Sequence, residues 1–518
     1  MKRRTRIAGD GGNQGLEENT LALLDTSGFN ASKVSHHLDD DRLAFLEAVR
    51  TTSLKIDDGN APTRKMLEAI FHILIDADSL DLVIQSYQLL VELDKFVFEL
   101  CFTSEHYIID IQRFPRLYLS EGEQSDSSSH KVSPFIMVEE AWSPFSFTMD
   151  GYDKKRDATN HSRSLVDSSV CHQATYVVSF GFHTLIKEIA DVAVEMKSEA
   201  VDIGFMKKML LLQYLVTVLE GDFWPRNSTY RENLDWTILR ESLLSMLLGS
   251  RKIIYKGLIK SSLSVLYNLS QSTVSSEEDS CSDKTQGEEL HEVDRAIALA
   301  LPELEKSTCN VLKKFFIMIM ELDSSKRTAD QHGLTTRADG VRTPAVEIIL
   351  DELINDSDVL SSFLKVFDPK WRLEIIVQYF QKYISKVRNL IFPLVQKLNS
   401  VQTRSSTGTI NTENFDGLLK YLSNSKRTKS IIKKITTEAI QLLLAYGFQA
   451  YVMLLHAESQ GFSDMMEDVK SNSAVGVCED LISAFTCLRR EDPNTGILCC
   501  GKQALITAAA TISNLRSI

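Results

Sequence analysis

Glycine and proline are scarce in this chain of 518 residues, which contains 23 and 10 of them. A β-sandwich or barrel needs many turns rich in these residues, so their shortage argues against an all-β fold and favours long helices. Hydrophobic residues at 43% and charged residues at 25% are ordinary for a globular protein and exclude a disordered chain. The length predicts about three domains or one extended repeat-like body.

Paired cysteines and an apolar leader are also missing. The 8 cysteines include no Cys-x-x-Cys pair, and Met1 is followed by basic residues rather than an apolar run. Free thiols are typical of the cytosol and the nucleus. The longest apolar stretches, Met209–Leu219 and Phe315–Met320, fall short of the roughly 20 residues that cross a bilayer. We therefore expect a soluble intracellular protein with no membrane contact.

Positive charge is in deficit, since 57 Lys and Arg face 70 Asp and Glu, for a net charge of −13. This balance argues against a protein whose whole surface binds nucleic acid, but it permits a local basic surface. Two basic clusters occur, Lys2–Arg6 and the group Lys426, Arg427, Lys429, Lys433 and Lys434. Neither cluster has aromatic residues interleaved in the sequence, so solvated helix faces explain them equally well.

No motif for catalysis or metal binding is complete. Residues 496–503 (GILCCGKQ) resemble a phosphate-binding loop, but Gln503 stands where a Ser or Thr must coordinate magnesium, and no strand is predicted before it. His36 and His37 are adjacent, and the cysteines from Cys478 to Cys500 lack zinc-site spacing, so structural roles explain them better. We predict no catalytic residue, cofactor, metal or small-molecule substrate, and a protein that is not an enzyme.

Apolar residues recur at helical spacing through most of the chain. The predicted fold class is all-α, an irregular armadillo/HEAT-like α-solenoid of helical hairpins with disordered acidic loops. Helix starts are indicated at Asp39–Asp41, Pro62-Thr63, Thr343-Pro344 and Asp368-Pro369. Phe96–Phe98 and Tyr176–Phe182 are either strands or buried helical turns. The clearest helices are predicted over 185–196, 205–219, 236–248, 253–269, 289–322, 344–355, 359–367, 369–386, 415–424, 430–456, 476–489 and 502–516.

Shifts in composition divide the chain into segments. Loop 270–289 has acids that closely follow serines, which is typical of a disordered, phosphorylatable linker. The predicted segments are a flexible basic and Gly-rich arm (1–15), an N-terminal helical segment (16–120), a Ser-rich loop with a WSPF segment (121–175), a middle helical segment (176–269), the acidic disordered loop (270–289) and a C-terminal helical segment (290–518).

Two places carry candidate contacts for a protein partner. In the turn TRADGVRTP (336–344), two guanidinium groups on either side of Asp339-Gly340 could hold a carboxylate or phosphate. Alternatively, they pair with the acids of the helix that follows. The segment AWSPFSF (141–147) offers aromatic anchors of the kind that dominate interfaces. The candidate partner-binding residues are Trp142, Phe145, Arg337, Asp339 and Arg342.

Several segments resemble the family of the plant negative regulator of systemic acquired resistance. They are AWSPFSF (141–147), LDWTILRESLL (234–244), the block from Ile319 to Leu353, FDPKWRLEIIVQYFQKYI (367–384) and LISAFTCLRR (481–490). The family is armadillo-like and nuclear, and the resemblance runs from about Leu16 to the C-terminus. Residues 96–111, 170–194 and 387–399 stand outside it, as insertions of one lineage or as retained introns.

The resemblance implies a non-enzymatic nuclear repressor of plant defence genes. It also implies a subunit of the complex of the fifth and sixth SMC proteins, which acts in DNA-damage response and recombination. Its partners there would be SMC-complex subunits and a second helical, non-SMC subunit, with DNA contact indirect or weak. The alternative from the residues themselves is a direct DNA-binding repressor that uses the two basic clusters.

Overall fold

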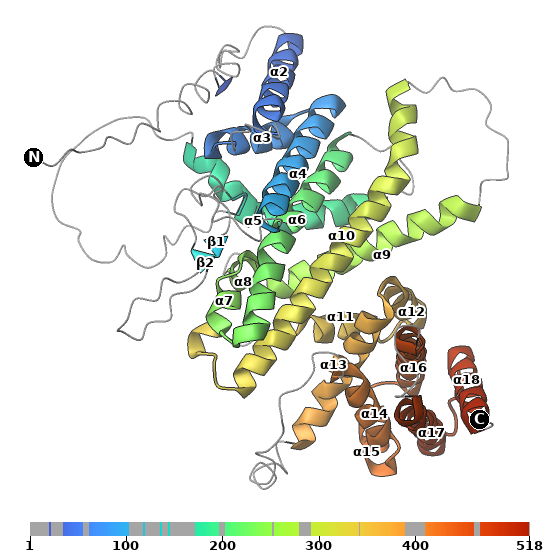
Figure 1. Cartoon of the computed structure of the whole chain (residues 1–518). Coiled ribbons are helices and arrows are strands. Elements are labelled where there is room, and N and C mark those ends of the chain that lie inside the picture. The colour runs from blue at the N-terminus through green and yellow to red at the C-terminus, as the bar shows by residue number, and fades with distance from the viewer. Residues whose placement is uncertain are drawn as a thin grey trace, which may run out of the picture. The chain divides into compact units, whose positions relative to one another are not determined.

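The part of the chain that the computed structural model describes is all-α, as predicted, apart from one ribbon of two very short strands. It divides into two compact units, unit 1 within Met1–Gly340 and unit 2 within Val341–Ile518. The main contacts join helices at most four places apart along the chain, as in an irregular α-solenoid (Figure 1). The structure describes residues 20–21, 35–54, 62–102, 118–119, 135–136, 143–145, 171–195, 203–250, 253–278, 292–340, 342–388, 410–459 and 467–516.

Unit 1 contains helices α2 to α10, a 3-10 turn and the ribbon. The helical bounds are α2 (Ser35–Ser53), α3 (Arg64–Asp76), α4 (Leu80–Phe102), α5 (Cys171–Glu195), α6 (Ile203–Asn233), α7 (Trp236–Arg240), α8 (Leu243–Gly249), α9 (Tyr255–Glu278), α10 (Glu292–Gln331) and the 3-10 turn η2 (Arg337–Asp339). Strands β1 (Tyr118–Leu119) and β2 (Phe135–Ile136) pair antiparallel, with Tyr118 opposite Ile136.

Helix α6 is the centre of unit 1. It packs against α3, α4, α5, α7, α8 and α10, and it buries side chains on all of its faces. Gln213 of this helix is 4% exposed. Its Nε2 donates to Thr308 Oγ1 of α10 at 2.9 Å, and its Oε1 accepts from Tyr87 of α4 at 3.2 Å. Because a buried amide must find partners, these bonds set the register of three helices.

Helix α6 continues to Asn233, although the apolar run predicts an end at Leu219. Gly221 and Pro225 follow that run, and both residue types disfavour a helix interior. The extension buries Phe223 and Tyr230, at 0% and 2% exposed. Tertiary packing therefore outweighs local propensity here.

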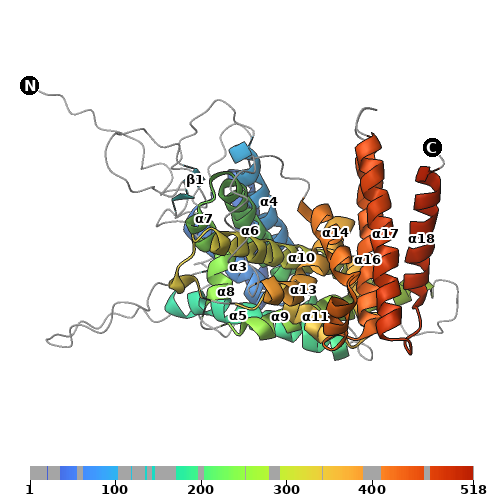
Figure 2. The ribbon, with the colours of Figure 1, turned by 90° about the horizontal axis from the view of Figure 1, so that it is seen from below.

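Unit 2 contains the remaining helices. Their bounds are α11 (Ala345–Leu353), α12 (Ser357–Val366), α13 (Pro369–Arg388), α14 (Ile410–Leu422), α15 (Ser425–Ile432), α16 (Thr437–Ser459), α17 (Glu467–Glu491) and α18 (Cys499–Arg516). Helix α16 packs against α12, α13, α17 and α18, and Figure 2 shows α16, α17 and α18 side by side. A Cβ at Gly447 of α16 would lie 2.7 Å from Cε2 of Phe415, so glycine allows α14 to pack this closely.

Several predicted boundaries differ from the structure. Phe96–Phe98 lies within α4 and Tyr176–Phe182 within α5, so the strand alternative is wrong at both places and the helical one is confirmed. Helix α2 begins at Ser35, ahead of the predicted acidic cap. At the start of α11, Pro344 is the N-cap residue and no side chain caps the helix. The start at Asp368-Pro369 is confirmed, since α13 begins at Pro369.

Two predicted helices are each divided in the structure. The stretch 236–248 forms α7 and α8, because Ser242 Oγ accepts from Ser245 N at 3.1 Å and starts a new helix. The stretch 430–456 forms α15 and α16, and Thr436 Oγ1 accepts from Ala439 N at 3.3 Å between them. The division between the units also differs from the compositional boundary at residue 290, since α10 packs against α6 and α9 in unit 1.

Residues 171–194 belong to a segment that the sequence analysis sets outside the family resemblance, and they form most of α5. Phe182, Ile186 and Ile189 are 0% exposed, and α5 packs against α6 and α9. The Phe182 ring centroid lies 5.6 Å from that of Phe315 on α10. Phe182, Ile186 and Ile189 are therefore part of the unit 1 core. The predicted arm (1–15) and residues 279–289 of the predicted acidic loop lie outside the described residues. Residues 270–278 of that loop form the end of α9, so the disordered loop is wrong over this part.

One helix in the described part of the chain is long and apolar enough to cross a membrane by length and composition. It is Thr437–His456 of α16, with a mean hydropathy of 1.4, and the sequence analysis missed it. In the folded unit, 61% of this stretch is buried. A central helix of a folded unit has the same composition, because its neighbours cover it on most sides.

Candidate partner-binding site

The turn after α10 has a fixed shape. Asp339 Oδ2 accepts from Thr336 N at 2.6 Å and from Thr336 Oγ1 at 3.0 Å, while Asp339 N donates to Thr336 O at 3.1 Å. These reciprocal bonds close a capping box around η2. Gly340 follows with φ +62°, a left-handed conformation that favours glycine. The predicted Asp339-Gly340 turn is thereby confirmed.

Helices α7 and α10 each donate hydrogen bonds to this turn. Trp236 at the start of α7 donates its indole N–H to Asp339 Oδ1 at 3.0 Å. Lys326 of α10 donates to the carbonyl oxygens of Asp339 and Gly340 at 2.7 and 2.6 Å. The turn is therefore joined to both α7 and α10. Two of the family-like segments, LDWTILRESLL and the block from Ile319, meet at this point.

The environment of Asp339 favours its carboxylate form. Partial burial raises the pKa of this carboxyl, but the hydrogen bonds from Thr336 and Trp236 and the charge of Arg240 outweigh that effect. The net result is a pKa below the ordinary value for aspartate. The turn therefore keeps its negative hydrogen-bond acceptor at neutral pH.

A second layer of polar contacts connects α6 with α10 beneath Trp236. The rings of Tyr230 and Trp236 meet edge to face, with centroids 6.2 Å apart, and the Tyr230 hydroxyl donates to Ser325 O at 2.9 Å. Asn227 Nδ2 donates to Glu321 Oε1 at 3.4 Å, and Glu321 also pairs with Arg231. These contacts align the C-terminal halves of α6 and α10, which carry the turn.

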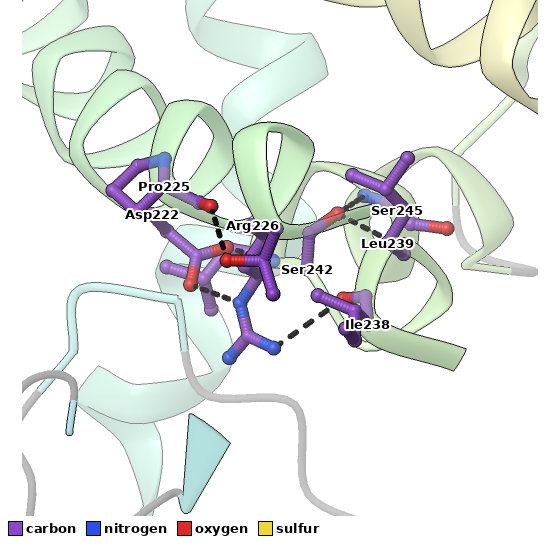
Figure 3. A network of polar contacts seen from close by, with 9 residues as sticks. Asp222, Pro225, Arg226, Ile238, Leu239, Ser242 and Ser245 are labelled. Atoms are coloured by element: carbon purple, nitrogen blue, oxygen red, sulfur yellow. Dashed lines mark hydrogen bonds and ion pairs between the residues drawn. The ribbon is translucent and has the colours of Figure 1, made fainter. Parts of the chain in front are cut away.

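A buried ion pair positions α7 and α8 against α6 (Figure 3). Arg226 Nε donates to Asp222 Oδ1 at 2.8 Å, with the two side chains 2% and 5% exposed. Asp222 Oδ2 accepts from Leu243 N at 2.6 Å, and the Arg226 guanidinium donates to Ile238 O at 3.4 Å. Burial raises the pKa of Asp222, and Arg226 and the Leu243 N–H offset part of that rise. The pair therefore fixes the turn between α7 and α8.

The guanidinium group of Arg337 is an exposed group of this turn. Arg337 lies in η2, and its side chain is exposed. Its guanidinium takes part in none of the hydrogen bonds or ion pairs found among the described residues. The turn thus holds an accessible cation on a rigid backbone, the geometry that bidentate capture of a carboxylate or phosphate requires.

The other predicted contact residues are placed differently. Phe145 is 2% exposed, and its ring packs edge to face on Phe182 at 5.9 Å, so it belongs to the core of unit 1 rather than to an exposed surface. Trp142 lies outside the described residues. Arg342 is half-buried and belongs to unit 2, whereas Arg337 belongs to unit 1.

Two of the acids of α11, Glu347 and Asp351, have a partner inside unit 2. Lys382 of α13 lies 2.6 Å from Asp351 Oδ2 and 3.7 Å from Glu347 Oε2. Tyr379 also donates to Asp351 Oδ1 at 3.2 Å. Lys382 therefore pairs with Asp351 and Glu347 inside unit 2, and the pairing of the two arginines with the acids of this helix stays an alternative.

The sequence analysis missed Trp236, Lys326 and the Asp222–Arg226 pair as parts of this site. The pair has the i, i+4 spacing of a helical ion pair, but its helix was predicted to end earlier. Trp236 and Lys326 are 90 residues apart in sequence, so no local pattern joins them. Only the packing of α7 against α10 brings them together.

Residues 496–503, which resemble a phosphate-binding loop, and the cysteines from Cys478 to Cys500 lie among structural contacts. Gln441 of α16 clamps the loop before α18, since its Nε2 donates to Gly496 O at 3.0 Å and its Oε1 accepts from Leu498 N at 2.9 Å. A Cβ at Gly501 would lie 2.9 Å from the Phe485 ring, so this glycine permits close helix packing. Burial raises the pKa of Cys478 to about 11. Among the described residues, no group of three His, Cys, Asp or Glu could hold a metal ion.

Comparison with known proteins assigns the family. The chain matches the model of the SNI1 middle domain over residues 116–369 and that of the SNI1 C-terminal domain over residues 396–516. It is 37% identical to the negative regulator of systemic acquired resistance SNI1 of Arabidopsis thaliana over 509 residues, which cover 98% of this chain and 96% of the relative. The chain belongs to the SNI1 family. No solved structure matches it.

The SNI1 match confirms the family resemblance seen in the sequence. The middle-domain match contains every residue of the Trp236–Asp339 site, from Asp222 to Gly340. It continues to residue 369 and so includes α11 and α12 of unit 2. The match to the SNI1 C-terminal domain spans α14 to α18. The relative is named as a regulator rather than as an enzyme.

Proposed function

We propose that this chain is a non-enzymatic nuclear regulator that represses the plant defence genes of systemic acquired resistance. One observation carries the proposal: the chain aligns with a negative regulator of systemic acquired resistance over nearly the full length of both proteins. The helical units support it, because stacked helices present extended surfaces for protein partners.

The proposal includes a partner complex. The chain acts as a subunit of the complex of the fifth and sixth SMC proteins in DNA-damage response and recombination, beside a second helical, non-SMC subunit. Arg337 is the contact residue that the geometry favours, because it is exposed on a turn held by Trp236, Asp339 and Lys326. Because the backbone of the turn is already fixed, binding at Arg337 costs the rotamer entropy of the side chain but little backbone entropy.

Co-purification tests the partner complex. The tagged full chain, recovered from a nuclear extract of the plant, is expected to bring down SMC-complex subunits identified by mass spectrometry. Arg337→Ala is expected to reduce their recovery. Arg64→Ala, which removes another exposed arginine of unit 1, is the matched control and is expected to leave recovery unchanged. Recovery of no SMC subunit from cells rich in the protein would contradict the partner assignment.

Complementation tests the regulatory role separately. Expression of this chain in a plant that lacks its own SNI1 is expected to restore low basal expression of defence genes. Unchanged, elevated defence-gene expression despite normal protein levels would contradict the repressor role. A fluorescent fusion in the same plants tests the nuclear location.

A further inference from the structure

One surface of unit 2 concentrates positive charge within an acidic protein. Residues 425–434 (SKRTKSIIKK) contain five basic side chains and no acidic one, while the whole chain has a net charge of −13. All five are exposed in the structure. We call these residues, Lys426, Arg427, Lys429, Lys433 and Lys434, the α15 basic surface.

The inner side of α15 is fixed, so the basic surface has a defined shape. Thr428 and Ile431 face inward at 0% and 2% exposed, and α15 packs against α14 and α17. Asn424 caps the helix by accepting from Arg427 N at 3.3 Å. At about 100° per residue, the five basic side chains leave α15 and its continuation within an arc of about 160°. They therefore point to one side.

The nearby carboxylates are engaged elsewhere. Asp416 pairs with Lys420, Glu491 accepts from the Ser425 hydroxyl, and Asp492 accepts from Thr437 and Thr495 at 2.7 Å each. No ion pair between residues that the structure describes involves any of the five basic residues. The described residues of unit 2 therefore leave the positive charge of the surface without an ion-pair partner.

Aromatic rings lie beneath this charge rather than beside it. The Arg427 guanidinium lies 4.9 Å from the ring centroid of Tyr421, which is 9% exposed, and Lys434 Nζ lies 5.5 Å from that of half-buried Tyr383. Single-stranded nucleic acid is held by exposed rings on which bases stack. A surface of cations with covered rings instead fits a regular row of phosphates.

We propose that the α15 basic surface binds the phosphate backbone of duplex DNA without sequence preference. Lys426 and Lys433 are separated by about 10 Å along the helix axis, and one strand of duplex DNA carries a phosphate every ~3.4 Å of its axis, so about three phosphates of a strand fall within this length. This inference goes beyond the proposed function, which requires protein partners only. It assigns direct DNA contact to one of the two basic clusters noted in the sequence.

Binding of purified full chain to a 30-base-pair duplex at low salt, followed by fluorescence anisotropy, tests the inference. The variant K426E/K429E/K433E is expected to weaken binding at least about ten-fold and to lower the slope of log K against log salt by about 2.7, at about 0.9 per phosphate contact. The control K365E/K370E/K502E makes the same charge change at exposed lysines on α12, α13 and α18, and is expected to change affinity less than about three-fold.

Equal loss in the two variants, or binding that does not respond to salt, would overturn the inference. So would loss on neutralising Lys2–Arg6 alone, which would place the contact in the arm. Capture of an acidic peptide with no measurable DNA binding would also overturn it, in favour of a protein ligand. If the triple glutamate variant melts earlier than its control, the triple glutamine variant at the same lysines replaces it. No partner protein is present in this test, so its result is independent of the co-purification result.

Discussion

The α6–α10 pair of unit 1 and two buried side chains of unit 2, Arg372 and Gln441, use different hydrogen-bond partners. In unit 1, polar side chains of α6 bind polar side chains of α10, as Gln213 binds Thr308 and Asn227 binds Glu321. In unit 2, the buried Arg372 and Gln441 bind main-chain atoms of neighbouring turns: Arg372 donates to Leu364 O and Phe367 O, and Gln441 contacts Gly496 O and Leu498 N.

This difference indicates how each unit sets its helix register. Paired side chains between α6 and α10 allow few relative positions, because any shift leaves a buried polar group without its partner. In unit 2, glycines at tight contacts, such as Gly447 beside Phe415, set the distance between helices by steric fit. The candidate site of unit 1 therefore depends on polar contacts, whereas the basic surface of unit 2 depends on a well-packed inner side of α15.

Breaking the buried ion pair should have the largest effect. Asp222→Ala leaves the Arg226 guanidinium buried without its carboxylate, and we expect a loss of about 3–5 kcal/mol in the free energy of unfolding of unit 1. Hydrogen exchange measured peptide by peptide should show faster exchange in α6 to α8, with α16 unchanged. The double variant Asp222→Leu/Arg226→Met should lose less than the single one, because it leaves no unpaired charge. Equal exchange in Asp222→Ala and the unmodified chain would contradict the role of the pair.

A comparable loss is expected from Phe182→Ala. The ring is 0% exposed between Phe145 and Phe315, so its removal should cost about 3–5 kcal/mol of unit 1 stability through lost burial and a cavity. Thermal unfolding of the purified chain measures it. Val194→Ala, at a position 57% exposed in the same helix, is the control. A negligible effect of Phe182→Ala would mean that α5 is a dispensable insertion.

Gly447→Ala tests the steric register of unit 2. The added methyl group would meet the Phe415 ring at 2.7 Å, and we expect a loss of about 1–3 kcal/mol from overpacking. The matched control is Gly417→Ala, because a Cβ there has no atom within 4 Å and alanine favours the helix. Stabilisation by both variants, in chemical denaturation, would show that α14 and α16 do not pack this closely.

The smallest effect is expected from Trp236→Phe, which removes the indole N–H donated to Asp339. A hydrogen bond to a charged group contributes about 1.5–3 kcal/mol, and the partial exposure of Asp339 places the expected loss near or below the lower end. Trp371→Phe in unit 2 is the control. Tryptophan fluorescence during denaturation is unsuitable for either variant, so circular dichroism should follow the unfolding.

The same contact predicts a pH dependence. The folded pKa of Asp339 lies below its unfolded value, so its contribution to stability is full above pH 4 or so and is lost as the pH falls through the folded pKa. The stability difference between the unmodified chain and Trp236→Phe should therefore shrink below about pH 4. A difference that stays constant down to pH 3 would assign the effect of the substitution to packing alone.

The sequence by itself determined the helical class, most helix positions and the family. Scarce glycine and proline, apolar residues at helical spacing and the Asp-Pro start of α13 are local features, and local features predict local structure. The Asp339-Gly340 turn was also predictable, because the positive φ at Gly340 suits glycine.

Only the tertiary structure decided which residues form the site and which form the core. The sequence predicts both Phe145 and Arg337 as partner-binding residues. In the structure, Phe145 is buried against Phe182, whereas Arg337 is exposed on a turn that Trp236 contacts through Asp339. Helix α6 continues through Pro225, and α10 joins unit 1, because burial against distant partners outweighs local propensity and composition. Residues 90 or more positions apart, such as Trp236 and Lys326, leave no joint pattern in the sequence, so their contacts become visible only in the tertiary structure.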